Sequence, residues 1–589
     1  MEHRWSLKEL YDSFESKEFK EDLIRCDKFI DKIKEISETF ADSKEENIKK
    51  LENYISVDNE FFHLSFKLLS FCQLSLSVET TNVEALKYLE VIEEKITELA
   101  EPNTKVAKWI GKLQNLDDII GSSTILKEHN FYLKEIQQNN KYVLSEKEET
   151  IISKMRNTGS SAWSKLQDLT LSNLLVKINI NGKEEKLPLT VVRNMAYDAN
   201  DNIRKTAYIA ELAAYSEIED VSAACLNGIK GEVITVDKLR GYKSPLEESL
   251  ISSKMDQKTL DSMFSAISEY LPVFRKYFRK KAQILSYKGG LPFYEMFAPI
   301  GKSSRKYTFE EARDFIVENF KTFSDKLADY ALKAFNNKWI DAEPREGKVG
   351  GAFCENLHVI GESRIMSNFT GNFNDVVTLA HELGHGYHGA CLLKESAINS
   401  EYPMPIAETA STFCETIIKK AATDKVDKEE SISILETEIS DCAQVIVDIY
   451  SRFLFESEVF KRREKGSISV EELKSIMLEA QKKAYGDGLD SNYLHPYMWI
   501  CKPHYYSADF NFYNYPYAFG LLFSKGLYSI YLKDKEKFVK EYDKLLALTG
   551  KNKIFDIAKF MNIDINSVSF WKESLELIKE DIDKFITLA

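Results

Sequence analysis

The stretch His381-Glu-Leu-Gly-His-Gly-Tyr-His388 says more about this 589-residue chain than any other part of it, and it holds three of the nine histidines. Residues four apart lie on one face of an α-helix, with Cβ atoms about 5–6 Å apart, so the rings of His381 and His385 can bind one zinc ion. Glu382 is rotated off that face by one residue, so it can serve as a base without being a ligand. This is the H-E-x-x-H arrangement of zinc-dependent proteases.

The residues around the motif predict a helix that is mostly buried. Asn374 suits the N-cap and Asp375 the first turn, and apolar residues then recur with helical spacing up to the motif. Buried histidines and a buried glutamate need partners, which a metal ion would provide. Gly384, Gly386 and Gly389 are unfavourable inside a helix. They indicate either a backbone or substrate very close to this helix, or tight packing between helices.

A catalytic zinc site needs a third protein ligand and an open position for water. His388 is close in sequence, but it lies about 10 Å from His381 along the axis of a regular helix. Binding one ion with both would strain that helix. We therefore expect the third ligand to be a carboxylate from a second helix.

That second helix is predicted to begin near Pro403, with Pro405 in its first turn. Glu408 and Glu415 are seven residues apart and hence share a face, among small and apolar residues where lone carboxylates are unfavourable. We predict Glu408 as the third ligand and Glu415 as a residue that orients a histidine. The alternative is that both glutamates lie on a solvated face.

The two motifs together resemble the M3 family of metallopeptidases, and the oligoendopeptidase F branch is the closest match. The resemblance implies one zinc ion held by His381, His385 and Glu408, with Glu382 as the general base. It also implies a mostly α, two-lobed helical fold that encloses a deep cleft, with a small β element beside the active-site helix.

Other segments carry the same resemblance over essentially the whole chain. Residues 350–354 and 363–371 resemble the stretch before the family's motif helix, which implies a strand that borders the cleft and pairs with substrate. Residues 194–207 resemble the start of the peptidase domain, and residues 5–11 resemble the family's N-terminus.

Residues 504–517 concentrate aromatic rings and hydroxyl groups at a density found nowhere else in the chain. Peptide hydrolysis places negative charge on the substrate carbonyl oxygen, and hydrogen-bond donors aimed at it stabilise the transition state. The resemblance implies that His504 and one or two tyrosines are such donors. Tyr513, Tyr515 and Tyr517 compete, and we select the first two; the alternative is an aromatic core strip.

Composition limits the partners and the compartment. The net charge is −14 and no basic patch appears, so we do not expect a nucleic-acid partner. No uninterrupted apolar run approaches membrane-spanning length; the best, residues 519–532, is broken by Lys525. The eight cysteines are scattered without a C-x-x-C pair, which favours a reduced, cytoplasmic setting. The oligomeric state is not predicted.

Low glycine and proline contents favour long helices. One hairpin is predicted, with a strand from Leu174 to Ile180, a turn at Asn181-Gly182 and a second strand that ends near Leu189. We predict an N-terminal helical lobe over residues 1–190 and a catalytic domain over residues 191–589.

The predicted function is a zinc-dependent endopeptidase that hydrolyses internal bonds of short oligopeptides. Two alternatives stay open. The chain could be a peptidyl-dipeptidase of the same fold, or a non-catalytic helical protein that binds peptides.

Overall fold

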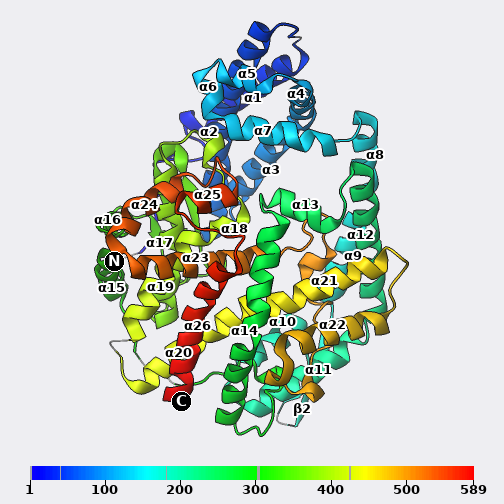
Figure 1. The fold of residues 1–589 in the computed structure, drawn as a ribbon, viewed down its shortest axis with the longest axis vertical. Coiled ribbons are helices and arrows are strands. Elements are labelled where there is room, and N and C mark those ends of the chain that lie inside the picture. Colours follow the sequence, from blue (N-terminus) through cyan, green and yellow to red (C-terminus); the bar gives the residue numbers. More distant parts are fainter. Residues whose placement is uncertain (1–2, 40, 181, 302–304, 424–425) are drawn as a thin grey trace. The chain divides into compact units, whose positions relative to one another are not determined.

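A computed structural model describes residues 3–39, 41–180, 182–301, 305–423 and 426–589. These residues are mostly helical with two small sheets, which confirms the predicted fold class (Figure 1). The chain divides into two compact units, each made of three separate segments. Unit 1 comprises residues 1–143, 304–421 and 530–563, and unit 2 comprises residues 144–303, 422–529 and 564–589. The predicted domains, 1–190 and 191–589, divide the chain elsewhere and stay a prediction.

Unit 1 contains the following helices: α1 (Lys17–Glu38), α2 (Lys44–Val78), α3 (Val83–Thr97), α4 (Ala100–Lys112), α5 (Leu116–Gly121), α6 (Thr124–Glu128), α7 (Asn130–Asn139), α15 (Phe309–Phe323), α16 (Asp325–Asn336), α17 (Phe373–Leu392), α18 (Met404–Ala407), α24 (Lys535–Ala547) and α25 (Ile554–Phe560). α19 (Thr409–Thr423) begins in this unit. The buried faces of the first seven helices share one apolar core.

Among the described residues, α2 is the one helix that is long and apolar enough to cross a membrane, by length and composition only. Its apolar stretch is interrupted by His63, Lys67 and Gln73, so the expectation that no uninterrupted apolar run approaches membrane-spanning length is unchanged. Half of its apolar window is buried inside the structure. Its buried side chains belong to the core of unit 1, as in a core helix of a soluble protein.

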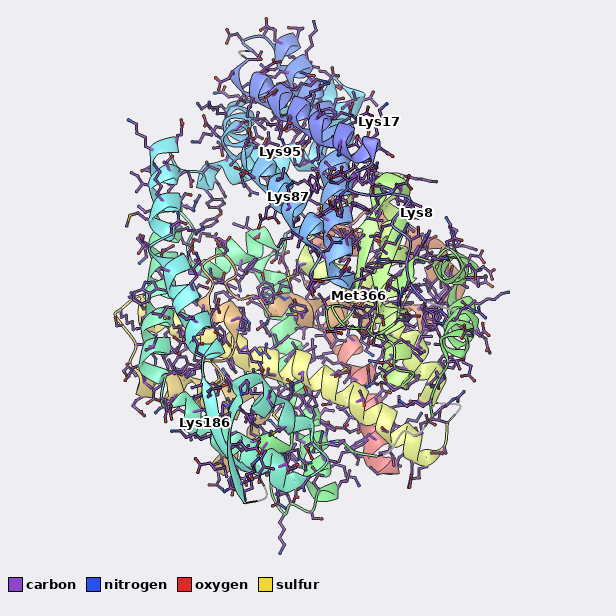
Figure 2. All side chains as sticks on the ribbon, turned by 180° about the vertical axis from the view of Figure 1, so that it is seen from behind. Lys8, Lys17, Lys87, Lys95, Lys186 and Met366 are labelled. Atoms are coloured by element: carbon purple, nitrogen blue, oxygen red, sulfur yellow. The ribbon has the colours of Figure 1, made fainter. Side chains whose placement is uncertain are left out.

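A three-stranded sheet in unit 1 lies beside α17, in the order β3-β5-β4. β3 (Ile340–Asp341) is parallel to β5 (Glu362–Met366), and β4 (Phe353–Leu357) is antiparallel to β5. Met366, labelled in Figure 2, ends β5. The sheet confirms the small β element predicted beside the motif helix, and β4 is one of its edge strands.

Unit 2 is helical apart from one hairpin. Its helices are α8 (Glu146–Arg156), α9 (Ser160–Ser172), α10 (Leu189–Asn194), α11 (Asp201–Tyr215), α12 (Glu219–Arg240), α13 (Pro245–Ser252), α14 (Gln257–Ile284), α20 (Lys428–Ala443), α21 (Ile449–Arg463), α22 (Val470–Tyr485) and α26 (Val568–Leu588), together with most of α23 (Tyr515–Lys533). α14 and α26 lie side by side (Figure 1).

The hairpin confirms the prediction made from the Asn-Gly pair. β1 (Leu175–Ile180) and β2 (Lys183–Pro188) are antiparallel. Gly182 has a φ of 84°, the left-handed conformation that a tight turn needs and that glycine adopts without strain. Asn181 lies outside the described residues.

Candidate metal centre and catalytic site

α17 carries the H-E-x-x-H motif and begins two residues earlier than predicted. The side chain of Asn372, not Asn374, is the N-cap, and its oxygen accepts the N–H of Asp375 at 3.0 Å. The Asp375 carboxylate in turn accepts the N–H of Asn372 at 3.3 Å. These reciprocal bonds form a capping box, which fixes the start of the helix at Phe373.

Three ligand atoms converge on one point beside α17. The Nε2 atoms of His381 and His385 are 3.1 Å apart. Glu408 Oε2 lies 3.3 Å from His381 Nε2 and 3.4 Å from His385 Nε2. Tetrahedral zinc with bonds of 2.0–2.1 Å would place adjacent ligand atoms about 3.3–3.4 Å apart. The two imidazoles and the carboxylate therefore fit three of four positions around such an ion.

The sequence predicted one helix through Glu408 and Glu415, but the structure has two helices that meet at Glu408. α18 ends at Ala407 and α19 begins at Thr409, with Glu408 between them at φ −83° and ψ 5°. Ser411 Oγ donates to Glu408 Oε2 at 2.8 Å. Burial acts to raise the pKa of Glu408, but His385, His381 and Ser411 outweigh it and hold that pKa at about 2. The carboxylate is therefore ionised, as a metal ligand must be.

Glu415 contacts His381 from the side of the ring opposite the convergence point, in agreement with the prediction that it orients a histidine. Its Oε1 accepts a hydrogen bond from His381 Nδ1 at 2.5 Å, which turns Nε2 of that ring toward the convergence point. Lys419 Nζ donates to Oε2 of Glu415 at 2.7 Å. Burial opposes protonation of His381, but the bond to Glu415 and its charge outweigh burial and raise the pKa of His381 to about 9.

Metal binding by the metal-free protein should therefore release a proton at pH 7. Below pH 9 His381 is mostly protonated, and an ion can bind only the deprotonated nitrogen, so apparent affinity should rise as the pH approaches 9. Titration calorimetry in two buffers with different ionisation enthalpies measures the released proton. Glu415→Gln removes the charge and should reduce that release. Heats that do not depend on the buffer would contradict this prediction.

Glu382 lies close to the two histidines. A carboxylate oxygen of Glu382 and one ring nitrogen each of His381 and His385 lie within 4.8 Å of one another, and only 6% of Glu382 is exposed. Burial raises its pKa, although the two histidines act in the opposite direction. A carboxylate with a raised pKa is a stronger base, which suits proton transfer.

Gly384 explains how α17 and the segment around Glu408 come so close. A Cβ at this position would lie 2.6 Å from Ser411 Cα and 2.7 Å from Ala410 O. These are backbone atoms of α19, which cannot move aside as a side chain can. The glycine therefore permits the backbone contact that the sequence had indicated.

Gly384→Ala is expected to destabilise the protein by about 1–3 kcal/mol, because the new methyl group overpacks this contact. It should also weaken metal binding, since Ala410 follows Glu408 by two residues. Thermal unfolding and metal content measure the two effects. Gly121→Ala is the control, because a Cβ there meets nothing within 4 Å. Equal effects of the two substitutions would contradict the packing argument.

His388 has partners of its own in the core of unit 1. Its Nε2 hydrogen-bonds Thr549 Oγ1 at 2.9 Å, and its ring stacks on Tyr402 with centroids 4.1 Å apart. The residue is fully buried, and burial lowers its pKa to about 3. These contacts agree with the view that His388 is a packing neighbour rather than a ligand.

The aromatic segment that contains His504 belongs to unit 2. The rings of His504 and Tyr513 stack with centroids 5.7 Å apart, and the hydroxyls of Tyr513 and Tyr517 are 2.8 Å apart. Burial lowers the pKa of His504 to about 3, helped by nearby cationic side chains, so the ring is neutral near pH 7. Tyr515 differs. It is 1% exposed, and its hydroxyl is bound to Ser249 and Ser253 of unit 2.

Comparison with known proteins identifies the family. The model of peptidase family M3 matches residues 194–577, and an oligopeptidase F model matches residues 113–174. The chain belongs to peptidase family M3.

Relatives of this M3 peptidase cover most of its length. Oligopeptidase PepF of Bacillus subtilis is 24% identical over 78% of this chain and 69% of its own. An oligoendopeptidase F homolog of Borreliella burgdorferi is 24% identical over 87% of this chain and 88% of its own. A crystal structure from Chlamydophila abortus superposes with a TM-score of 0.85 at 22% identity, over 100% of this chain and 98% of that one, which shows a shared fold.

Three residues that support the M3 peptidase site were not singled out from the sequence. Ser411 and Lys419 follow their glutamate partners by three and four residues, so helical spacing alone could have indicated them. Asn356 of β4 donates from Nδ2 to the carbonyl of His385 at 3.1 Å. Nothing in the local sequence pattern indicates that long-range contact.

Proposed function

We propose that this M3 peptidase is a zinc endopeptidase that hydrolyses internal bonds of oligopeptides. The observation that carries the proposal is the triangle of His381 Nε2, His385 Nε2 and Glu408 Oε2, with Glu382 buried beside it. Two imidazoles and a carboxylate form a donor set that suits zinc. The names of the relatives, oligopeptidase and oligoendopeptidase, support oligopeptides as substrates.

A zinc ion at this triangle would act as a Lewis acid and bring the pKa of a water molecule toward about 7. Glu382 then takes the proton of the attacking water and passes it to the departing amine. Its buried carboxylate has a raised pKa, which favours the uptake of the proton from water. Glu415 keeps the Nδ1 side of His381 occupied, so that Nε2 faces the ligand triangle.

We assign the stabilisation of the substrate's carbonyl oxygen to His504 and Tyr513. A neutral imidazole retains one N–H donor, and the stacked Tyr513 adds an O–H donor. Tyr515, selected with Tyr513 from the sequence, is left out, because its hydroxyl already donates to the Ser249 carbonyl of α13 and to the side chain of Ser253, which follows α13.

His504→Ala is expected to lower kcat by about 10²–10³-fold, the usual effect of removing one such donor, with a smaller change in KM. Steady-state kinetics on a fluorogenic peptide measures both. Tyr515→Phe is the matched control, and it should reduce stability rather than kcat. If Tyr515→Phe lowers kcat as much as His504→Ala does, the exclusion of Tyr515 is wrong, and a near wild-type kcat of His504→Ala would contradict the assignment of His504.

Peptides with blocked ends test the endopeptidase assignment. A quenched octapeptide with an acetylated N-terminus and an amidated C-terminus should be cleaved internally, and mass spectrometry gives the bond. A peptidyl-dipeptidase would instead cleave only the peptide with a free C-terminus, two residues from its end. A protein that binds zinc and peptide without cleaving either peptide would support the non-catalytic alternative.

We further propose a reduced, cytoplasmic setting. All eight cysteines lie among the described residues and none of them forms a disulfide, which is typical of proteins from reducing compartments. Oxidising conditions should therefore not be needed for folding or activity.

A further inference from the structure

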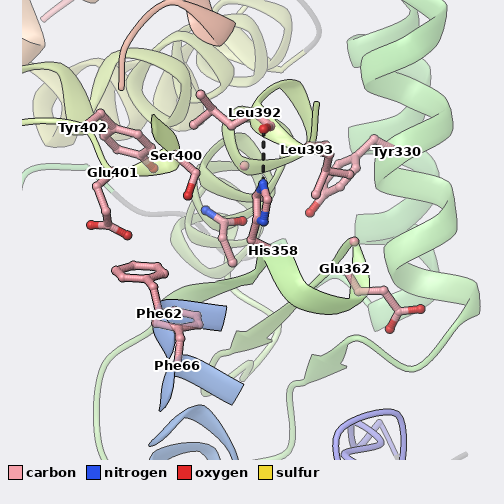
Figure 3. Close-up of a pocket in the computed structure, with 15 residues that line it drawn as sticks. Phe62, Phe66, Tyr330, His358, Glu362, Leu392, Leu393, Ser400, Glu401 and Tyr402 are labelled. Carbon is pink, nitrogen blue, oxygen red and sulfur yellow. Dashed lines mark hydrogen bonds between the residues drawn. The ribbon is translucent and has the colours of Figure 1, made fainter. Parts of the chain in front are cut away.

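A pocket with a volume of about 230 Å³ lies beside α17 in unit 1 (Figure 3). Its walls are formed by residues of α2, α16, β4 and the turn after it, the start of β5, α17, and the segment that follows α17. The large apolar groups among them are Phe62, Phe66, Leu392, Leu393 and Tyr402. An apolar cavity of about 150 Å³ can hold benzene, so this pocket has room for a large apolar side chain.

The pocket lies on the same stripe of α17 as the proposed catalytic base. Glu382 is followed by Gly386, Gly389 and Leu393 at intervals of four, three and four residues, and the last three line the pocket. At 1.5 Å per residue, the pocket begins about 6 Å beyond Glu382 and continues past 10 Å. His385, the second proposed histidine ligand, directly precedes Gly386, the first residue of α17 that lines the pocket.

Both glycines have a role in building the pocket walls. A Cβ on Gly386 would clash with the hydroxyl of Tyr330, and a Cβ on Gly389 would lie 2.3 Å from the side chain of Asn356. Because neither glycine has a side chain, Tyr330 and Asn356 reach the helix backbone and become walls of the pocket.

β4 is the second element that lies next to both Glu382 and the pocket. Cys354 and Asn356 are two apart in this strand, so their side chains face the same way. The charge of Glu382 acts on the Cys354 thiol and contributes to its raised pKa after burial, while Asn356 contacts both His385 and the pocket. β4 is an edge strand of its sheet, and an extended peptide can add to such an edge.

We infer that this pocket is a specificity subsite that takes a large apolar or aromatic side chain of the peptide substrate. The inference rests on the proposed function and specifies its substrates further. An extended peptide advances about 3.3 Å per residue, so the distance from Glu382 corresponds to two or three residues from the scissile bond. Glu401 at the pocket wall disfavours an acidic side chain.

The end of α17 is held in place at this subsite. His358, in the turn after β4, hydrogen-bonds the carbonyl of Leu392 through Nε2 at 3.3 Å (Figure 3). The rings of Phe62 and Phe66 on α2 are nearly parallel, with centroids 5.9 Å apart. The walls are therefore built from packed elements, as in a largely pre-formed site.

Quenched peptides that carry Phe, Leu, Ala or Glu at each of three positions on either side of the cleaved bond test this inference. At one position, Phe and Leu should exceed Ala in kcat/KM by about tenfold or more, and Glu should be disfavoured. Phe66→Ala should reduce the Phe-to-Ala ratio of kcat/KM by about tenfold. Phe61→Ala is the matched control, because Phe61 packs into the core and does not line the pocket.

Metal content and thermal unfolding show whether each variant is folded. If Phe66→Ala does not fold, Ala390→Phe fills the pocket from α17 and should reduce the same ratio. The inference is overturned if the wild type shows no preference at any position, or if a folded pocket variant keeps the wild-type ratio. Failure of the zinc-loaded wild type to cleave any peptide would overturn the proposed function, and this subsite with it.

Discussion

Glu382→Gln is expected to lower kcat for peptide hydrolysis by about 10²–10⁴-fold while the protein still binds one zinc ion. The amide has nearly the same shape as the carboxylate but cannot accept the proton of the attacking water. The three vertices of the ligand triangle belong to His381, His385 and Glu408, so the substitution leaves them in place. The buried amide also removes a charge from a site where burial raises the pKa of the acid.

Two measurements together identify the role of Glu382. Steady-state kinetics on a blocked quenched peptide gives kcat, and metal analysis of the dialysed protein gives zinc per chain. Glu382→Asp keeps a carboxylate on a shorter side chain, so it should retain more activity than Glu382→Gln. Near wild-type cleavage by Glu382→Gln would show that another group is the base, and loss of zinc would show that Glu382 is a ligand.

The part of the site that lies within one helix was predictable from sequence. The four-residue spacing of His381 and His385 fixes their common face once the segment is helical, and Glu382 follows from the same geometry. The start of that helix was predicted two residues late. Asn372 and Asn374 are equally good caps by residue type, and only the reciprocal bonds with Asp375 distinguish them.

The second helix shows a different limit. The chain was predicted to run as one helix through Glu408 and Glu415, and both glutamates do reach the histidines. The helix is nevertheless interrupted at Glu408. The spacing of apolar residues indicates which residues share a face of a helix. A single non-helical residue changes that spacing too little to be recognised from the sequence.

Contacts between distant segments could not be predicted from local patterns. Asn356 holds the carbonyl of His385 across 29 residues of sequence, and the Tyr515 hydroxyl is bound to Ser249, 266 residues away. The first contact supports α17, and the second leaves the Tyr515 hydroxyl out of the proposed set of donors to the substrate's carbonyl oxygen. The division into two units, each of three segments, depends on many such contacts.

Substitution of Glu408 should weaken zinc binding, whereas substitution of His388 should not. Glu408→Ala removes the carboxylate that lies 3.3 and 3.4 Å from the two imidazoles. Removal of an outer hydrogen-bond partner costs about 10–100-fold in metal affinity, and loss of a direct ligand should exceed about 100-fold. His388→Ala removes a buried ring that contacts Thr549 and Tyr402, so it should cost about 1–3 kcal/mol of stability and leave zinc bound.

Zinc competition with a chromophoric chelator measures affinity, and urea unfolding of the metal-free proteins measures intrinsic stability without the contribution of bound zinc. The decisive result is the pattern across both assays, because any substitution in a packed core can lower stability. Glu408→Ala should lose affinity far beyond its loss of intrinsic stability, whereas His388→Ala should lose stability alone. If zinc is released by His388→Ala and retained by Glu408→Ala, the third ligand is His388, and the helix must then distort to bring it within reach of the ion.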